Sequence, residues 1–138
     1  MNISKFTQKS VQAIELCEKL AYEYQNQEID QEHLLYALLT IDDSLIGKMI
    51  EKMEINLSHF TNRVEKELSR RVKVSGGQVY IGAELNKALI HAEDEAKQMG
   101  DSYVSVEHLF LSLLKYPNAE MKKLFIPISE MYEAWKSA

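Results

Sequence analysis

The sequence contains few of the features that secreted, membrane-spanning or nucleic-acid-binding proteins need. Its single cysteine, Cys17, excludes an intramolecular disulfide and fits a reducing cytosol. The opening MNISKFTQKS lacks the apolar core of a signal peptide, and the longest apolar run, LLYALL, is far too short to span a bilayer. Basic residues are outnumbered, with 16 Lys and Arg against 21 Asp and Glu, so the net charge is −5. This charge argues against a nucleic-acid phosphate backbone or a membrane surface as the main partner. We therefore expect a soluble, cytoplasmic protein.

What the sequence does contain is a repetition. QEHLLYALL at 31–39 returns as VEHLFLSLL at 106–114, and the apolar spacing before each stretch is that of one helix face. The offset of 75 residues holds between 7–39 and 82–114. Eight residues of the first stretch are identical to their partners: Ala13, Glu18, Ala21, Glu32, His33, Leu34, Leu38 and Leu39. A fixed offset predicts a duplicated supersecondary unit, and two copies make a pseudo-dimer rather than a solenoid.

Capping residues and helix breakers predict where the helices of each unit begin and end. Asp30 and Ser105 stand at matching positions before EHL, where a short oxygen-bearing side chain can accept from the free N–H groups of a helix start. The second helix of each unit therefore begins there, and it ends near Ile41 in the first unit and before Pro117 in the second. Third helices are expected around Leu45–Lys52 and Ala119–Phe125.

Two further features concern the third and fourth helices. Gly47 lies inside the first of the third helices and should weaken it by about 1 kcal/mol relative to alanine, unless close packing compensates. An offset of 71 pairs Leu57 with Ile128 and Val64 with Trp135, which predicts a fourth helix in each unit. Pro127 suits the first turn of the last one, because its missing N–H would be unpaired there.

The stretch between the units, VKVSGGQVYIG at 72–82, departs from helical spacing and holds three of the five glycines. It is too short and partly too apolar to be freely disordered, so we expect a linker that packs along the two bundles. The predicted fold is all-α, with two pseudo-repeats of four helices each, or eight helices. We expect a single domain over 1–138, with repeat one at about 6–70, the linker at about 71–82 and repeat two at about 83–136.

Three stretches of the sequence resemble a known family. KFTQKSVQAI, QEIDQEHLLYALL and GGQVYIGAELNKALIHAEDEAKQMGDSYVSVEHLFLSLL are similar to the amino-terminal double-repeat (Clp N) domain of the Clp/Hsp100 unfoldases, in particular the ClpB-like ones. The resemblance covers nearly the whole chain, with a weak match after Phe125. It implies an all-α module that recognises substrates and adaptors, attached by a flexible linker to two AAA+ ATPase rings that thread aggregated or tagged polypeptides through a pore.

The residues do not support catalysis by the chain itself. A P-loop requires Gly-x-x-x-x-Gly-Lys-Ser/Thr, and GGQVYIGAEL has Ala83 and Glu84 where Lys and Ser/Thr belong. His91 and Glu95 have the spacing of two metal ligands on one helix face, but two ligands do not make a site, so no metal is expected. Cys17 fits a buried thiol better than a nucleophile. An enzyme built on a helical bundle would need a pocket with perturbed acids, and the sequence identifies none.

The family suggests positions for client handling. A threonine before the first helix, an aspartate after the glycine that ends the fifth helix and a glutamate at the start of the sixth match Thr7, Asp101 and Glu107. Each also has a structural interpretation: Thr7 can cap a helix, Asp101 can belong to the turn after Gly100, and Glu107 can favour a helix N-terminus. The two interpretations are compatible.

The resemblance also implies an apolar groove between the halves, with positions near Leu89, His91 and His108. ClpB-like proteins can carry leucine where this chain has histidine, which predicts that client binding weakens as these histidines protonate below about pH 6.5. The alternative interpretation places His33 and His108 at helix starts, each after a glutamate that complements the helix dipole.

Charge is unevenly distributed. Residues 48–73 contain seven Lys or Arg and four Glu, while the remainder of the chain is acidic. Such a patch could meet an acidic adaptor or the rest of the machine, although a charge run is more often a solvated helix face.

The prediction is a substrate- and adaptor-recognition module of a ClpB-like disaggregase, without cofactor; ATP is expected only in AAA+ modules outside this chain. Expected partners are unfolded or aggregated polypeptides, an adaptor, and the protein's own AAA+ rings in a full-length hexamer, with the isolated domain monomeric. The alternative is a free-standing adaptor or regulator that docks on a separate AAA+ ATPase.

Overall fold

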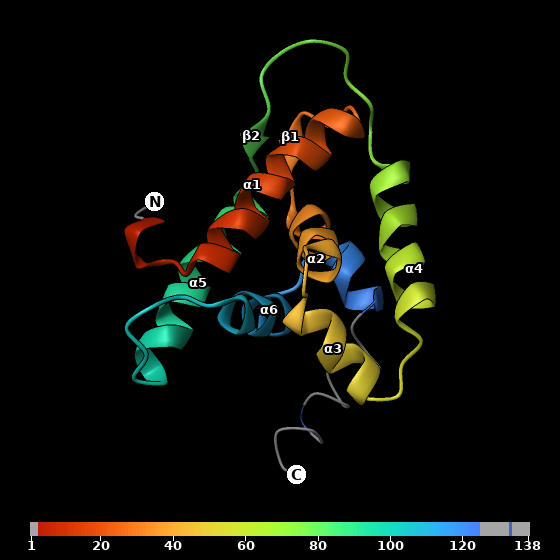
Figure 1. Ribbon diagram of the computed structural model, residues 1–138. Coiled ribbons are helices and arrows are strands. Elements are labelled where there is room, and N and C mark those ends of the chain that lie inside the picture. Colours follow the sequence, from red (N-terminus) through yellow and green to blue (C-terminus); the bar gives the residue numbers. More distant parts are fainter. Residues whose placement is uncertain (1–2, 125–132, 134–138) are drawn as a thin grey trace.

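The computed structural model describes residues 3–124 and 133 and is predominantly helical (Figure 1). A short 3-10 helix, η1 (Ile3–Lys5), is followed by α1 (Gln8–Glu23), α2 (Gln31–Thr40), α3 (Leu45–Lys52) and α4 (Leu57–Arg70). The second part of the chain forms α5 (Ala83–Gln98), α6 (Val106–Lys115) and a helical stretch at 119–124. Two short strands, β1 (Glu28–Ile29) and β2 (Tyr80–Ile81), pair in parallel.

The predicted helix boundaries agree closely with the structure, whereas the prediction of eight helices is not confirmed. Within 3–124 there are six α-helices with defined ends, besides η1 and the stretch at 119–124. The helix expected from Pro127 onward lies outside the described residues. The predicted linker also differs in part, because its last residues form β2 and so add a two-stranded sheet to a fold expected to be all-α.

Matching elements lie 75 residues apart. Helices α1 and α5 have 16 residues each, α2 and α6 have 10 each, and both pairs keep the offset. The connections match as well. Gly82 N–H donates to the Ile29 carbonyl at 2.9 Å, and Thr7 N–H donates to the Val104 carbonyl at 3.0 Å. The segment before the first helix of each half is therefore paired with the segment before the second helix of the other half.

Helix α2 occupies the middle of the molecule. It contacts α1, α3, α4, α5 and α6, and Figure 1 shows it surrounded by them. Of its residues 31–39, all except Tyr36 are buried. A short helix without a polar face is stable only when other helices cover it on every side. α2 and α6 thus supply much of the core, and α1 and α5 present their outer faces to solvent.

Two glycines hold positions where a side chain would not fit easily. A Cβ on Gly82 would lie 2.7 Å from the Glu28 side chain, so β2 reaches α5 beside β1 only without one. Gly47 is buried in α3, where a Cβ would lie 3.3 Å from the Ser44 hydroxyl and 3.4 Å from Leu57. Close packing therefore accompanies the helix-weakening glycine, as the sequence analysis required of a glycine at this position.

Candidate functional site

Thr7 is built into the junction between the two halves of the sequence. It caps α1, with its hydroxyl oxygen accepting from Ser10 N–H at 3.2 Å. The same hydroxyl donates to Ser10 Oγ at 3.0 Å, and Ser10 donates onward to the Val104 carbonyl at 2.9 Å. The predicted capping role is thus confirmed. Thr7 is half-buried, so part of it still faces solvent.

Asp101 and Glu107 flank the start of α6. Asp101 follows Gly100, whose φ of 75° is in the left-handed region that favours glycine. Its N–H donates to the Ala96 carbonyl at 2.8 Å and closes the end of α5. Glu107 is exposed in the first turn of α6, where a carboxylate complements the helix dipole. Both residues have the predicted structural roles, and both leave carboxylate oxygens accessible from solvent.

His108 lies at the start of α6, packed against the end of α5. Its side chain is buried, with 5 % exposed, and both ring nitrogens are occupied. Nδ1 accepts from the Ser105 N–H at 2.9 Å, so Nε2 carries the proton and donates to the Asp101 carboxylate at 2.8 Å. Protonating Nδ1 would break the bond to the helix cap. His108 therefore completes a capping box, as its alternative interpretation predicted.

The other histidine assigned to the groove lies on the surface of α5. His91 stacks on Tyr116, with ring centroids 3.8 Å apart and an angle of 13° between the ring planes. Its Nδ1 is 4.0 Å from the Asp94 carboxylate. Glu95, the second ligand of the rejected metal hypothesis, is buried and accepts from Lys115 at 2.9 and 3.1 Å. Among the described residues, no three His, Cys, Asp or Glu side chains could hold a metal ion together.

Leu89 is 1 % exposed and lines an apolar cavity of about 170 Å³ between α1, α5 and β2. Ile14 and Cys17 of α1, Leu85 and Leu89 of α5 and Leu34 of α2 form its walls. Burial raises the pKa of the Cys17 thiol, which keeps it protonated and unreactive.

Tyr80 and Ile81 of β2 stand at the rim of this apolar cavity, 52 % and 39 % exposed. Sequence reasoning assigned both to a linker and so missed them. The β-branched and aromatic residues of VYIG were the available signal for a strand.

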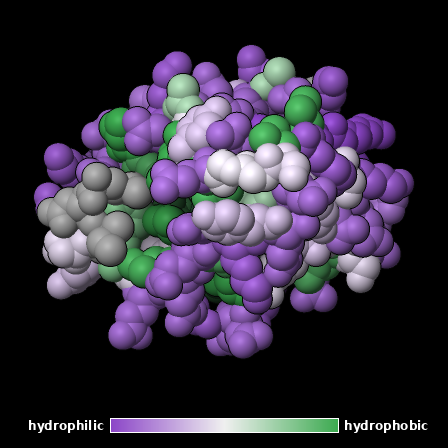
Figure 2. Space-filling model, turned by 90° about the horizontal axis from the view of Figure 1, so that it is seen from above, coloured by the Kyte–Doolittle hydropathy of each residue, from purple (hydrophilic) through white to green (hydrophobic). Residues whose placement is uncertain are grey.

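Viewed from above, the molecule is mostly hydrophilic, and hydrophobic side chains reach this face in separate small groups (Figure 2). At about 170 Å³, the cavity beside β2 is sized for a side chain rather than for a folded element.

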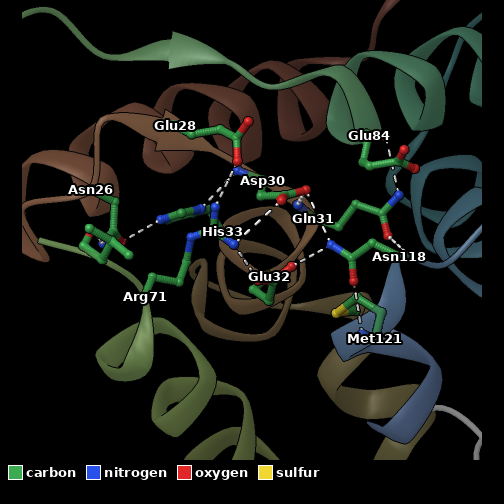
Figure 3. Close-up of polar contacts among 11 residues, drawn as sticks. Asn26, Glu28, Asp30, Gln31, Glu32, His33, Arg71, Glu84, Asn118 and Met121 are labelled. Carbon is green, nitrogen blue, oxygen red and sulfur yellow. Dashed lines mark hydrogen bonds and ion pairs between the residues drawn. The ribbon is translucent and has the colours of Figure 1, made fainter.

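A second, polar site lies at the start of α2. It was not predicted from the sequence. Arg71, directly after α4, reaches three carboxylates (Figure 3). Its guanidinium nitrogens are 2.6 Å from Glu32, 2.9 Å from Glu28 and 3.4 Å from Asp30. Glu32 is fully buried, and burial raises its pKa although the Asn118 amide and Arg71 act in the opposite direction. Residues far apart in sequence make this cluster, which is why spacing could not reveal it.

Asn118 ties the second half of the chain to the same cluster. Its side-chain amide donates to Glu32 at 2.7 Å and to Asp30 at 3.2 Å, while its oxygen accepts from Met121 N–H at 2.9 Å (Figure 3). Its backbone N–H donates to the Gln31 side chain at 2.8 Å. Asn118 thus caps the helical stretch at 119–124 and docks it on the start of α2.

His33 repeats the geometry of His108 in a drier setting. Its Nδ1 accepts from the Asp30 N–H at 2.9 Å, and its Nε2 donates to the Asn26 side-chain oxygen at 2.9 Å. Burial, and to a smaller extent the Arg71 charge, lower the pKa of His33 to about 4. His33 is therefore neutral at physiological pH.

Comparison with known proteins identifies the class. The model of the family described as "Clp repeat (R) N-terminal domain" matches residues 5–126, so the chain belongs to this family. The resemblance stated from the sequence is thereby confirmed.

Several curated relatives of this chain are ClpB chaperones. The chain is 39% identical over 122 residues to the chaperone protein ClpB of Nitratidesulfovibrio vulgaris, covering 85% of this chain and 14% of that protein. It is 36% identical over 129 residues to ClpB of Clostridium tetani, covering 90% of this chain and 15% of that protein. The chain is thus homologous to the N-terminal domain of ClpB, and it spans about one seventh of the length of these relatives.

Solved structures show the same fold. The Hsp104 N-terminal domain from Candida albicans has a TM-score of 0.79 at 20% identity, covering 88% of this chain and 79% of that one. A ClpV N-domain in complex with a VipB peptide has a TM-score of 0.72 at 21% identity, covering 89% of this chain and 78% of that one. Among the described residues, no helix is both long and apolar enough to cross a membrane.

Proposed function

We propose that the domain is the substrate- and adaptor-recognition module of a ClpB-like ATP-dependent disaggregase, which passes unfolded or aggregated polypeptides to AAA+ rings. The observation that carries this proposal is the apolar cavity between α1, α5 and β2, with exposed Tyr80 and Ile81 at its rim. An apolar recess with a hydrophobic rim can take up a side chain that an unfolded protein exposes, without reading its sequence.

The size of the cavity supports a single apolar side chain as its occupant. At about 170 Å³ it slightly exceeds an apolar cavity of about 150 Å³ that is known to hold benzene. A leucine or phenylalanine side chain is of similar size. Burying one such side chain contributes about 2 kcal/mol, so each contact is weak and clients can be released.

The comparison of residues 75 positions apart also supports an apolar side chain as the occupant of the cavity. Ile81 corresponds to Phe6, and Ile29 to Val104, at the two places where the halves pair. Phe6 is 6 % exposed and belongs to the hydrophobic core, whereas Ile81 is 39 % exposed at the rim of a cavity. We infer that the protein fills one of two equivalent recesses with its own phenylalanine and leaves the other for a client.

The polar candidates extend the proposed contact surface. Thr7 follows Phe6 and is bonded to Val104, and Asp101 lies three residues before Val104. With Glu107 they supply exposed oxygen atoms for the backbone N–H groups of a client. Leu89 forms part of the cavity wall, and His91 is a neighbouring group on the surface. His108 contributes to client binding only by orienting Asp101. A peptide complex of a ClpV N-domain supports peptide binding by this fold.

The residues before α5 fit a structural role rather than nucleotide binding. Gly77 has a φ of 85° in the loop, and Gly82 starts α5 with Glu28 packed where its Cβ would be. Glu84 in the first turn of α5 would repel a phosphate at this helix N-terminus. We propose that ATP hydrolysis belongs to other parts of the disaggregase.

An NMR titration of the labelled chain with an unfolded polypeptide rich in Leu and Phe tests the proposal. Saturable amide shifts are expected around Ile14, Tyr80, Ile81 and Leu89, with weaker ones at Thr7, Asp101 and Glu107. Tyr80→Ser should weaken binding several-fold, whereas Leu45→Ser, which removes an exposed apolar side chain on α3 (43 % exposed), should leave it unchanged. An absence of shifts at millimolar client would overturn direct client binding.

A further inference from the structure

A basic pocket lies on α4, apart from the apolar cavity. Arg63, Lys66 and Arg70 follow one another at three- and four-residue steps, so they share one face of α4. Lys123, from the helical stretch at 119–124, lines the same pocket of about 250 Å³, and the buried Leu124 contributes its apolar part. This basic pocket shares no residue with the apolar cavity beside β2.

The charges in the pocket are unbalanced. Among the described residues of its lining, Glu67 is the one carboxylate, and it pairs with Arg70 at 3.1 Å. Within residues 3–124, no carboxylate lies close enough, at 4.0 Å or less, to form an ion pair with Arg63, Lys66 or Lys123. Three cations that have no ion pair within the described part of the chain thus line one pocket of a protein whose net charge is −5. A concentrated positive field in an acidic molecule attracts anions to one place and steers their orientation.

The chemistry of the pocket favours an acidic peptide over a nucleic acid. A single nucleic-acid strand is bound by an extended basic groove with aromatic side chains on which bases stack, and none of the described residues that line this pocket is aromatic. The net negative charge of the chain would also repel a long phosphate backbone outside the pocket. Spaced carboxylates of an acidic segment match separate cations on two elements, and Leu124 can receive the aliphatic part of such a side chain.

We propose that Arg63, Lys66 and Lys123 form a docking site for an acidic segment of a partner polypeptide. The segment lies between α4 and the helical stretch at 119–124, with its carboxylates paired to these three cations. Glu67 opposes binding by its own charge and by occupying Arg70. Because the apolar cavity is separate, this site can be occupied whether or not an unfolded client is bound, so the two proposals can fail independently.

Fluorescence polarisation with a labelled peptide of alternating Glu and Gly tests this site. The triple variant Arg63→Gln, Lys66→Gln, Lys123→Gln should lose at least tenfold in affinity. The triple variant Lys19→Gln, Lys87→Gln, Lys97→Gln removes the same charge from exposed positions on α1 and α5 and should lose about twofold or less. Glu67→Gln should tighten binding two- to threefold, a gain that misfolding could not produce.

Three results would overturn the proposal. Equal losses of affinity in the two triple variants would show that binding depends on net charge alone and not on this pocket. No measurable binding at low ionic strength would exclude the site, because screening is weakest there. A single-stranded oligonucleotide of equal charge that binds more tightly than the peptide would assign the pocket to nucleic acid. Circular dichroism of each variant ensures that a loss is read only from folded protein.

Discussion

The two junctions between the halves of the chain have the same backbone pairing and different side-chain packing. At one, Phe6 pairs with Val104 and is buried; at the other, Ile81 pairs with Ile29 and stays 39 % exposed beside a cavity. A larger aromatic side chain reaches into the core where a β-branched one does not. A duplicated fold can therefore keep the same backbone pairing at two junctions while one of two equivalent side chains stays partly exposed beside a cavity.

The largest effect is expected from a substitution at the junction where Phe6 is buried. Phe6→Ala should lower the free energy of unfolding by about 3 kcal/mol, because it removes a buried aromatic ring and leaves a cavity. Ile81→Ala at the matching position should cost less than about 1 kcal/mol, because that side chain is already partly solvated. Urea unfolding of both variants measures the difference, and equal costs would contradict the contrast between the junctions.

A second prediction concerns the Arg71 cluster, which has no counterpart among the residues of the second half that the structure describes. Arg71→Gln should destabilise the protein by about 2–3 kcal/mol, since it leaves the buried Glu32 and its two neighbouring carboxylates without their cation. The adjacent Arg70→Gln removes the same charge from an exposed pair with Glu67 and should cost less than about 0.5 kcal/mol. Thermal unfolding at neutral pH compares the two, and a loss of similar size in both would show that the cluster does not stabilise the fold.

A third prediction sharpens the comparison of the two histidine caps, where Asn26 faces His33 and Asp101 faces His108. With a pKa of about 4 in the folded protein against 6.5 in an unfolded chain, His33 takes up a proton on unfolding. Its contribution to stability is complete above about pH 6.5 and is lost as the pH falls towards 4, by about 2–3 kcal/mol in total.

Asn26→Asp should raise the pKa of His33 and so reduce this acid-dependent loss. It should also lower the free energy of unfolding by about 1–2 kcal/mol at neutral pH, because the hydrogen bond that the Asn26 side-chain amide donates to the Val72 carbonyl is lost. Asn62→Asp, an exposed change of equal charge on α4, serves as the control. Unfolding curves between pH 7 and pH 4.5 provide the measurement. An identical pH dependence in both variants would refute this account of His33.

The sequence predicted the helical scaffold because its signals are local. Capping residues such as Thr7, Asp30 and Ser105 act within one turn, and the apolar spacing of α1 and α5 repeats at the same offset. It did not predict the Arg71 cluster, whose members come from α2, the end of α4 and the segment after α6. Spacing alone also left two interpretations of His108, because it could not decide whether the ring turns towards the cap or towards a groove. The exposed rim at Tyr80 and Ile81 depends on strand pairing across about 50 residues, for which a linker composition gives little warning.

The central claim is that the recess beside Ile81 receives a client side chain in the way that its counterpart receives Phe6. Ile81→Phe tests it most directly, because it gives the open junction the residue of the filled one. The account predicts that this variant is about 1 kcal/mol more stable and binds an unfolded Leu- and Phe-rich polypeptide at least tenfold more weakly. Ile90→Phe, at an exposed position of α5, should change neither quantity. A stabilised Ile81→Phe variant that binds the polypeptide as tightly as the original chain would contradict the claim.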